Sequence, residues 1–157
     1  MKPTPPTAAV LTTAFYAFYD LHRPAYHAYA AARLPQEEAH LSVTQLFDLI
    51  ASNWTWLMTK QCPSAWAWEK HTRAVARRTG RTPTPAEDTA LLHDDLRLSI
   101  DRIATITGTD PARVTTLLAA ARRPAGRAPE AVGHVQERLG ASGAGGLLTS
   151  TIGTRTR

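Results

Sequence analysis

Apolar side chains recur at steps of three and four along most of this chain, which is the spacing of amphipathic helices. Between Thr13 and Leu34 the recurring residues are aromatic: Phe15, Phe18, Tyr19, Tyr26 and Tyr29. Pro24 interrupts this pattern, which predicts either a kinked helix or two shorter ones. Further helices are predicted from Glu37 to about Trp56 and from Ser64 to Arg78. Because no strand-type alternation of useful length occurs, we expect an all-α fold.

The predicted core-facing stripe of the second helix is apolar throughout and consists of Val43, Leu46, Phe47, Ile50 and Trp54. Helical spacing places Trp54 and Trp66 toward the core. It leaves Trp56 and Trp68 as the better candidates for a contact surface, where aromatic rings could stack on bases.

The segment 98–123 has the pattern of two helices joined by a tight turn. Ser99 is placed to cap the first helix, and Gly108 supplies the turn because a residue without Cβ adopts positive φ at little cost. Asp110 and Pro111 suit the N-cap and first position of the second helix. Such a helix-turn-helix usually places its second helix in the DNA major groove. The same unit also occurs in helical proteins that do not bind DNA.

The apolar residues of this segment keep the same helical spacing in both helices. The expected buried positions are Ile100, Ile103, Ala104 and Ile106 in the first helix, and Val114, Leu117, Leu118 and Ala121 in the second.

Proline, glycine and composition divide the chain into five parts. We expect a flexible leader at 1–12, a helical domain at 13–78, a Pro- and Gly-containing linker at 79–85, a helix-turn-helix domain at 86–123 and a disordered tail at 124–157. The second domain has room for one helix, from about Ala86 to Leu96, ahead of the helix-turn-helix. The predicted architecture is two small helical domains on a short tether.

The charge balance permits a nucleic-acid partner without demanding one. The net charge is +5, but residues 1–123 carry 14 Lys and Arg against 11 Asp and Glu. Cys62 is the single cysteine, so no intramolecular disulfide can form and a reducing, cytoplasmic setting is expected. No uncharged stretch approaches membrane-spanning length, which predicts a soluble protein without a membrane partner.

Two helical modules in this order resemble the extracytoplasmic-function group of RNA polymerase sigma factors. The resemblance covers about residues 14–123. It is carried by FYAFYDLHRPAYHAYAAARL at 15–34, VTQLFDLIASNW at 43–54, PSAWAWEKHTRAVARR at 63–78 and LSIDRIATITGTDPARVTTLLAAARR at 98–123. It implies that the first domain is similar to the one that binds the polymerase core and melts the promoter. The second would resemble the domain that reads the upstream promoter element.

The second helix departs from the family pattern at the positions that meet the polymerase. Members carry an acidic Asp-xx-Gln-Glu-like face there, whereas this chain has Leu41, Thr44 and Gln45 at the matching positions. Carboxylates remain nearby at Glu37, Glu38 and Asp48. The resemblance therefore implies a polymerase- or partner-binding surface that includes Glu38, Leu41, Thr44, Gln45, Asp48 and, on the recognition helix, Leu117.

Candidate DNA contacts form two groups. Lys70, Arg73 and Arg77 share one helix face, with Arg78 and Arg81 beside them, which suits either a phosphate track or an ordinary solvated surface. On the helix-turn-helix the candidates are Thr109, Arg113, Thr115, Arg122 and Arg123. Family members place Lys or Arg where this chain has Thr115 and Leu117, so the recognition face has lost cations that would contact phosphates or guanine edges.

No motif in the sequence indicates an enzyme, and the sequence suggests neither a catalytic residue nor a cofactor. The six histidines, at 22, 27, 40, 71, 93 and 134, show no metal-ligand spacing, so no metal site is expected.

Three hypotheses follow. The first is a sigma-factor-like transcription regulator that binds RNA polymerase core, promoter DNA or both, with an anti-sigma or other protein as a possible further partner. The second is a degenerate sigma-like adaptor or decoy that binds proteins and has lost promoter recognition. The third is a small repressor that uses the helix-turn-helix alone, as a dimer on a two-fold site.

Overall fold

The computed structural model describes residues 2–124, and all of their regular structure is helical. The elements are α1 (Ala8–Ala31), α2 (Gln36–Ser52), α3 (Trp54–Leu57), α4 (Pro63–Thr79), α5 (Pro85–Ala90), the π-helical turn η1 (Leu91–Asp95), α6 (Ile100–Thr107) and α7 (Pro111–Ala121). The all-α prediction is therefore confirmed for this part of the chain. The tail predicted at 124–157 lies, apart from Pro124, outside the described residues.

Helix α1 is longer than the sequence pattern predicts. It begins at Ala8, where the Thr7 hydroxyl accepts a hydrogen bond from the amide of Val10 at 3.4 Å, so residues 8–12, which the sequence placed in a leader, belong to this helix. Pro24 lies inside this single helix. Buried aromatic residues on both sides of the proline, Phe18 before it and Tyr26 after it, pack into one core. This shared burial offsets the helix hydrogen bond that the proline removes.

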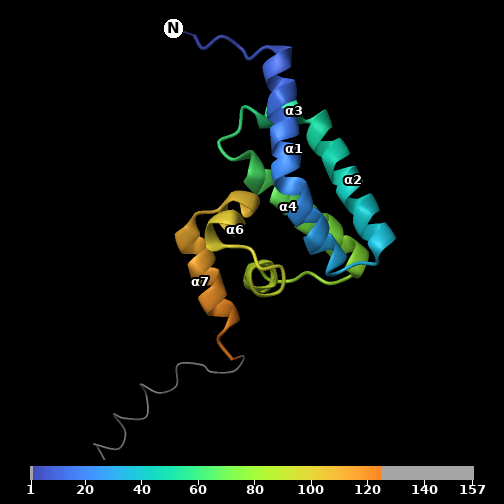
Figure 1. The fold of residues 1–157 in the computed structure, drawn as a ribbon, viewed down its shortest axis with the longest axis vertical. Coiled ribbons are helices and arrows are strands. Elements are labelled where there is room, and N and C mark those ends of the chain that lie inside the picture. The colour runs from blue at the N-terminus through green and yellow to red at the C-terminus, as the bar shows by residue number, and fades with distance from the viewer. Residues whose placement is uncertain (1, 125–157) are drawn as a thin grey trace, which may run out of the picture. The chain divides into compact units, whose positions relative to one another are not determined.

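Helix α2 packs along α1 and against α4 (Figure 1). Its predicted apolar stripe is confirmed: Val43, Leu46, Phe47 and Ile50 are all buried. The helix ends at Ser52, earlier than predicted, and the short α3 begins at Trp54. Trp54 is buried and its indole N–H donates to the carbonyl oxygen of Leu11 at 2.8 Å, which ties α3 to the first turns of α1.

Two of the six histidines belong to this core. His71 of α4 stacks on Tyr26 with ring centroids 4.8 Å apart, and its Nε2 donates to the Tyr26 carbonyl oxygen at 2.9 Å. Burial lowers the pKa of His71 to about 4, so its ring is neutral at physiological pH. His22 stacks on Phe18, and burial lowers its pKa as well. Both rings therefore contribute to the packing of this core.

The two helices predicted at 98–123 are present with the predicted caps. The Ser99 hydroxyl accepts from the amide of Arg102, and the Asp110 carboxylate accepts from the amide of Arg113 at 2.8 Å. Gly108 ends α6 with φ of 70°, and Pro111 is the first residue of α7. That this pair of helices reads DNA stays a prediction.

The core residues of this pair are the expected ones at most positions. Ile103, Ala104 and Ile106 of α6 and Val114 and Leu118 of α7 are buried. Ile100 and Leu117 are half-buried, whereas Ala121 is exposed.

The segment ahead of α6 is helical but not one regular helix. Thr84 and Glu87 form a capping box at the start of α5, in which the Glu87 carboxylate accepts from the Thr84 amide at 2.7 Å. The helix then continues as the π-helical turn η1 up to Asp95, close to the predicted end at Leu96.

The turn between α6 and α7 lies directly against the start of α4. A Cβ atom at Gly108 would be 2.6 Å from Cα of Ala65, and the Cys62 thiol donates to the Gly108 carbonyl oxygen at 3.5 Å. From α6, the Arg102 guanidinium donates to the Leu21 carbonyl oxygen of α1 at 2.8 Å. Residues Met1–Arg122 thus form one compact unit. The division of this stretch into domains at 13–78 and 86–123 stays a prediction from the sequence.

Among the described residues, no helix is long and apolar enough to cross a membrane.

The contact at Gly108 can be tested with a matched pair of glycine variants. Gly80 also has positive φ, of 72°, but a Cβ there would meet no atom within 4 Å. We expect Gly80→Ala to lower the free energy of unfolding by about 1 kcal/mol, the cost of left-handed backbone for alanine. Gly108→Ala should lower it by about 2–4 kcal/mol, because the backbone of Ala65 must also move. Urea unfolding measures both, and equal losses would show that the turn does not rest on α4.

Candidate functional site

A pocket of about 850 Å³ lies between α4, the 80–89 segment and the α6–α7 pair. Its lining brings together five residues that the sequence singled out for DNA or partner binding: Arg73, Arg77, Thr109, Arg113 and Leu117. These residues lie up to 44 positions apart in the chain, so their meeting depends on how α7 packs relative to α4.

The three arginines of the pocket differ in their partners. Arg73 forms an ion pair at 2.7 Å with Glu69, one helical turn away, and both side chains are largely exposed. Neither Arg77 nor Arg113 forms an ion pair with any residue in 2–124. Arg77 and Arg113 are thus the guanidinium groups of the pocket whose charge is not balanced by a neighbouring carboxylate.

The other predicted cations of this region point elsewhere. The Nζ atom of Lys70 lies over the ring of Trp66, at a distance of 5.5 Å from the ring centroid. Arg78 donates to the Gln45 side chain of α2 at 2.9 Å, and Arg81 forms an ion pair with Glu87 at 2.8 Å. Of the five cations predicted as a phosphate track, four therefore have a local partner of their own. The fifth, Arg77, lines the pocket.

On α7 the predicted contacts are also divided. The Thr115 hydroxyl donates to the Pro111 carbonyl oxygen at 3.0 Å within its own helix. Arg122 lies 3.5 Å from Asp94, and Arg123 is exposed. Leu117, which the sequence placed both among the buried positions of its helix and on the partner-binding surface, is half-buried and lines the pocket.

The predicted polymerase-binding residues of α2 are exposed together on its outer face. Leu41 is 47% exposed, and Glu38, Thr44, Gln45 and Asp48 are exposed beside it. The structure adds Leu49, 42% exposed, which the sequence analysis missed. Its position eight residues after Leu41, two helical turns along the same face, is the signal that could have revealed it.

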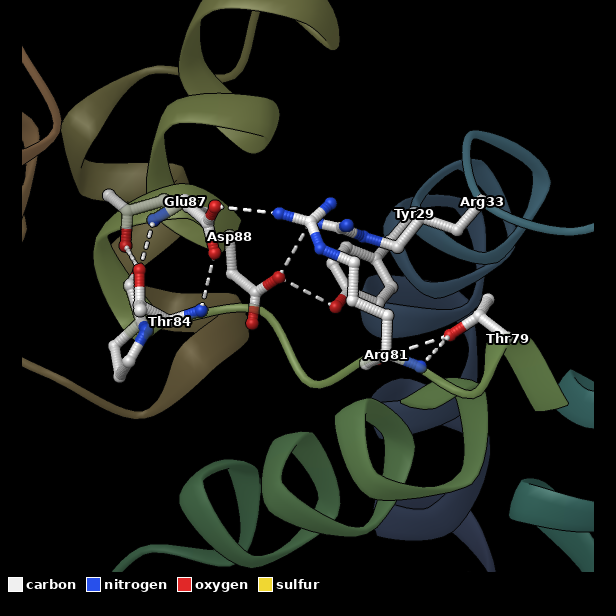
Figure 2. A network of polar contacts seen from close by, with 9 residues as sticks. Tyr29, Arg33, Thr79, Arg81, Thr84, Glu87 and Asp88 are labelled. Carbon is white, nitrogen blue, oxygen red and sulfur yellow. Dashed lines mark hydrogen bonds and ion pairs between the residues drawn. The ribbon is translucent and has the colours of Figure 1, made fainter. Parts of the chain in front are cut away.

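A buried polar network connects α1 to α5 (Figure 2). The Asp88 carboxylate accepts a hydrogen bond from the Tyr29 hydroxyl at 2.7 Å and forms an ion pair with Arg33 at 2.8 Å. Burial raises the pKa of Asp88, against the opposing effects of the Tyr29 hydrogen bond and the Arg33 charge. The guanidinium of Arg33 also lies over the Tyr29 ring, 5.0 Å from its centroid.

This network fixes one wall of the pocket. Asp88 itself is among the lining residues, as are Gly80, Thr82, Pro83 and Pro85 of the segment that leads from α4 to α5. At the surface, the Arg81–Glu87 ion pair and the capping box at Thr84 restrain the backbone of this segment. The sequence predicts a linker over these residues, and nothing in it points to Asp88, since the partners of Asp88 lie more than 50 positions earlier.

The tryptophans follow the sequence expectation in part. Trp54 is buried and Trp56 is 47% exposed, as their spacing predicted, whereas Trp66, expected in the core, is half-buried. The Nζ atom of Lys60 lies over the ring of Trp56, at a distance of 4.3 Å from the centroid of that ring. Trp68 is half-buried rather than free, because it packs edge-on against Tyr29, and its remaining surface lines the pocket.

Within residues 2–124, no group of three or more His, Cys, Asp or Glu side chains is placed to hold a metal ion.

The chain matches no known protein-family model, no curated protein and no solved structure. The resemblance to sigma factors therefore rests on the sequence segments alone.

The Asp88 network gives a stability prediction. Asp88→Ala would leave the Arg33 guanidinium, which is largely buried, without its carboxylate, and we expect a loss of about 3–5 kcal/mol in the free energy of unfolding. Glu87→Ala is the matched control, since it removes a carboxylate from the adjacent, exposed residue and should cost clearly less. Chemical denaturation of both variants checks this, and equal losses would contradict a special role for Asp88.

Proposed function

We propose that the chain is a sigma-factor-like transcription regulator that binds the RNA polymerase core through the outer face of α2. The observation that carries this proposal is the exposure of Leu41 and Leu49 on one face of that helix, among polar and acidic side chains. This is also the helix on which the sequence resemblance places polymerase binding.

The composition of this face suits a protein partner. Protein interfaces combine an apolar centre with a polar rim, and the two leucines are bordered by Gln45 and by the carboxylates of Glu38 and Asp48. Neither carboxylate forms an ion pair within the described residues, so both are available to a basic partner surface. Gln45 is held by Arg78 of α4, which keeps this part of the face ordered.

Promoter DNA is a weaker part of the proposal. Arg113, Thr109 and Leu117 line a pocket whose opposite wall is α4, whereas a recognition helix must present such residues to a groove about 12 Å wide. Thr109 and Arg113 are exposed, but the half-buried Leu117 and the wall formed by α4 leave this face less open than that of a free recognition helix. This observation favours the second candidate, a sigma-like adaptor or decoy that binds protein partners without reading a promoter.

Polymerase binding is tested by capture of core RNA polymerase from the host with the purified full chain. We expect the native chain to retain core polymerase and Leu41→Glu to weaken retention at least about tenfold, because a charge would enter the apolar centre of the interface. Leu21→Glu is the matched control: it places the same charge on α1 at a leucine that is 38% exposed, and retention should be unchanged.

Failure of the native chain to retain core polymerase, or equal effects of the two substitutions, would overturn the proposal. A gel-shift measurement on promoter DNA then separates the two candidates. A salt-sensitive shift that disappears in Arg113→Ala would establish promoter contact, whereas polymerase binding without any shift would establish the adaptor.

A further inference from the structure

We propose that the pocket between α4 and α7 binds a small organic phosphate whose phosphate group is attached to an aromatic ring. This proposal does not depend on polymerase binding, because the pocket has no α2 residue in its lining and the ligand is of a different class.

The size of the pocket favours a small molecule over a lone ion. Its volume of about 850 Å³ lies within the range of roughly 300–1,000 Å³ typical of ligand sites. An inorganic phosphate would fill a small part of that space.

The charges of the pocket favour an anion. Arg73 is balanced by Glu69, and Asp88 is already engaged by Arg33 and Tyr29. The remaining charged side chains, Arg77 from α4 and Arg113 from α7, have no ion pair within residues 2–124 and leave the pocket with a positive excess.

The number of donors favours phosphate over carboxylate. Each guanidinium offers a fork of N–H groups that matches two oxygen atoms. A carboxylate has two oxygens and satisfies one fork, whereas a phosphate monoester has three terminal oxygens to share between two guanidinium groups. Three of the lining threonine hydroxyls, those of Thr72, Thr89 and Thr107, donate to carbonyl oxygens of their own helices, so the two guanidinium groups are the main donors.

The apolar part of the pocket favours an aromatic group. Trp68 is held edge-on against Tyr29 with ring centroids 4.9 Å apart, so its free surface is in place before any ligand arrives. Leu117 of α7 provides a second apolar contact in the lining. An aromatic ring beside the phosphate would cover this surface, and stacking on an aromatic side chain adds to affinity.

The probe for this proposal is 1-naphthyl phosphate, with 1-naphthol and inorganic phosphate as its two halves. Titration calorimetry of the full chain should show saturable binding of 1-naphthyl phosphate, tighter by at least about tenfold than binding of either half. Because the ligand would contact both α4 and α7, it should also raise the thermal unfolding midpoint.

Charge-removing variants locate the site. Arg77→Gln and Arg113→Gln should each weaken binding at least about tenfold, the loss expected for a charge-assisted hydrogen bond. Arg78→Gln is the matched control, since this neighbour of Arg77 has the same charge but contacts Gln45 on α2 and does not line the pocket. Its affinity should equal that of the native chain.

Absence of 1-naphthyl phosphate binding to the native chain would overturn the proposal. So would equal weakening in all three arginine variants, which would indicate non-specific attraction to a basic surface. Binding of inorganic phosphate as tight as that of 1-naphthyl phosphate would overturn the assignment of an aromatic ligand.

Discussion

The buried pair of Asp88 and Arg33, completed by the Tyr29 hydroxyl, is the interaction on which the rest of the helical unit depends. Removing a carboxylate and a guanidinium from water is unfavourable, and the pair persists because the two charges lie 2.8 Å apart and Tyr29 satisfies the same carboxylate oxygen. The contact joins the last turns of α1 to α5. It thereby fixes the segment that leads from α4 to α5, and with it one wall of the pocket.

A second constraint acts at the other end of the α6–α7 pair. Gly108 allows the turn to approach the backbone of Ala65 more closely than any residue with a side chain could. Together with Asp88, this contact fixes α7 opposite α4. The arginines that suggested a DNA-binding surface are separated as a result: Arg77 and Arg113 face a pocket, whereas Arg78 and Arg81 are held by residues at the surface.

Local features could be predicted from the sequence and long-range contacts could not. The caps at Ser99 and Asp110, the turn at Gly108 and the stripe from Val43 to Ile50 depend on residues a few positions apart, and all were predicted. The early start of α1 was missed because the cap at Thr7 follows a proline-rich segment that reads as a leader. Asp88 was missed because nothing near it in sequence shows that its partners are Tyr29 and Arg33.

The α6–α7 turn rests on the start of α4, and an NMR measurement tests this contact most directly. The close approach of Gly108 to Ala65 predicts strong nuclear Overhauser effects between the α protons of Gly108 and the amide and methyl protons of Ala65. Their absence, in a protein whose α4, α6 and α7 resonances show intact helices, would mean that the helix pair moves independently of α4. The pocket between them would then not exist in solution.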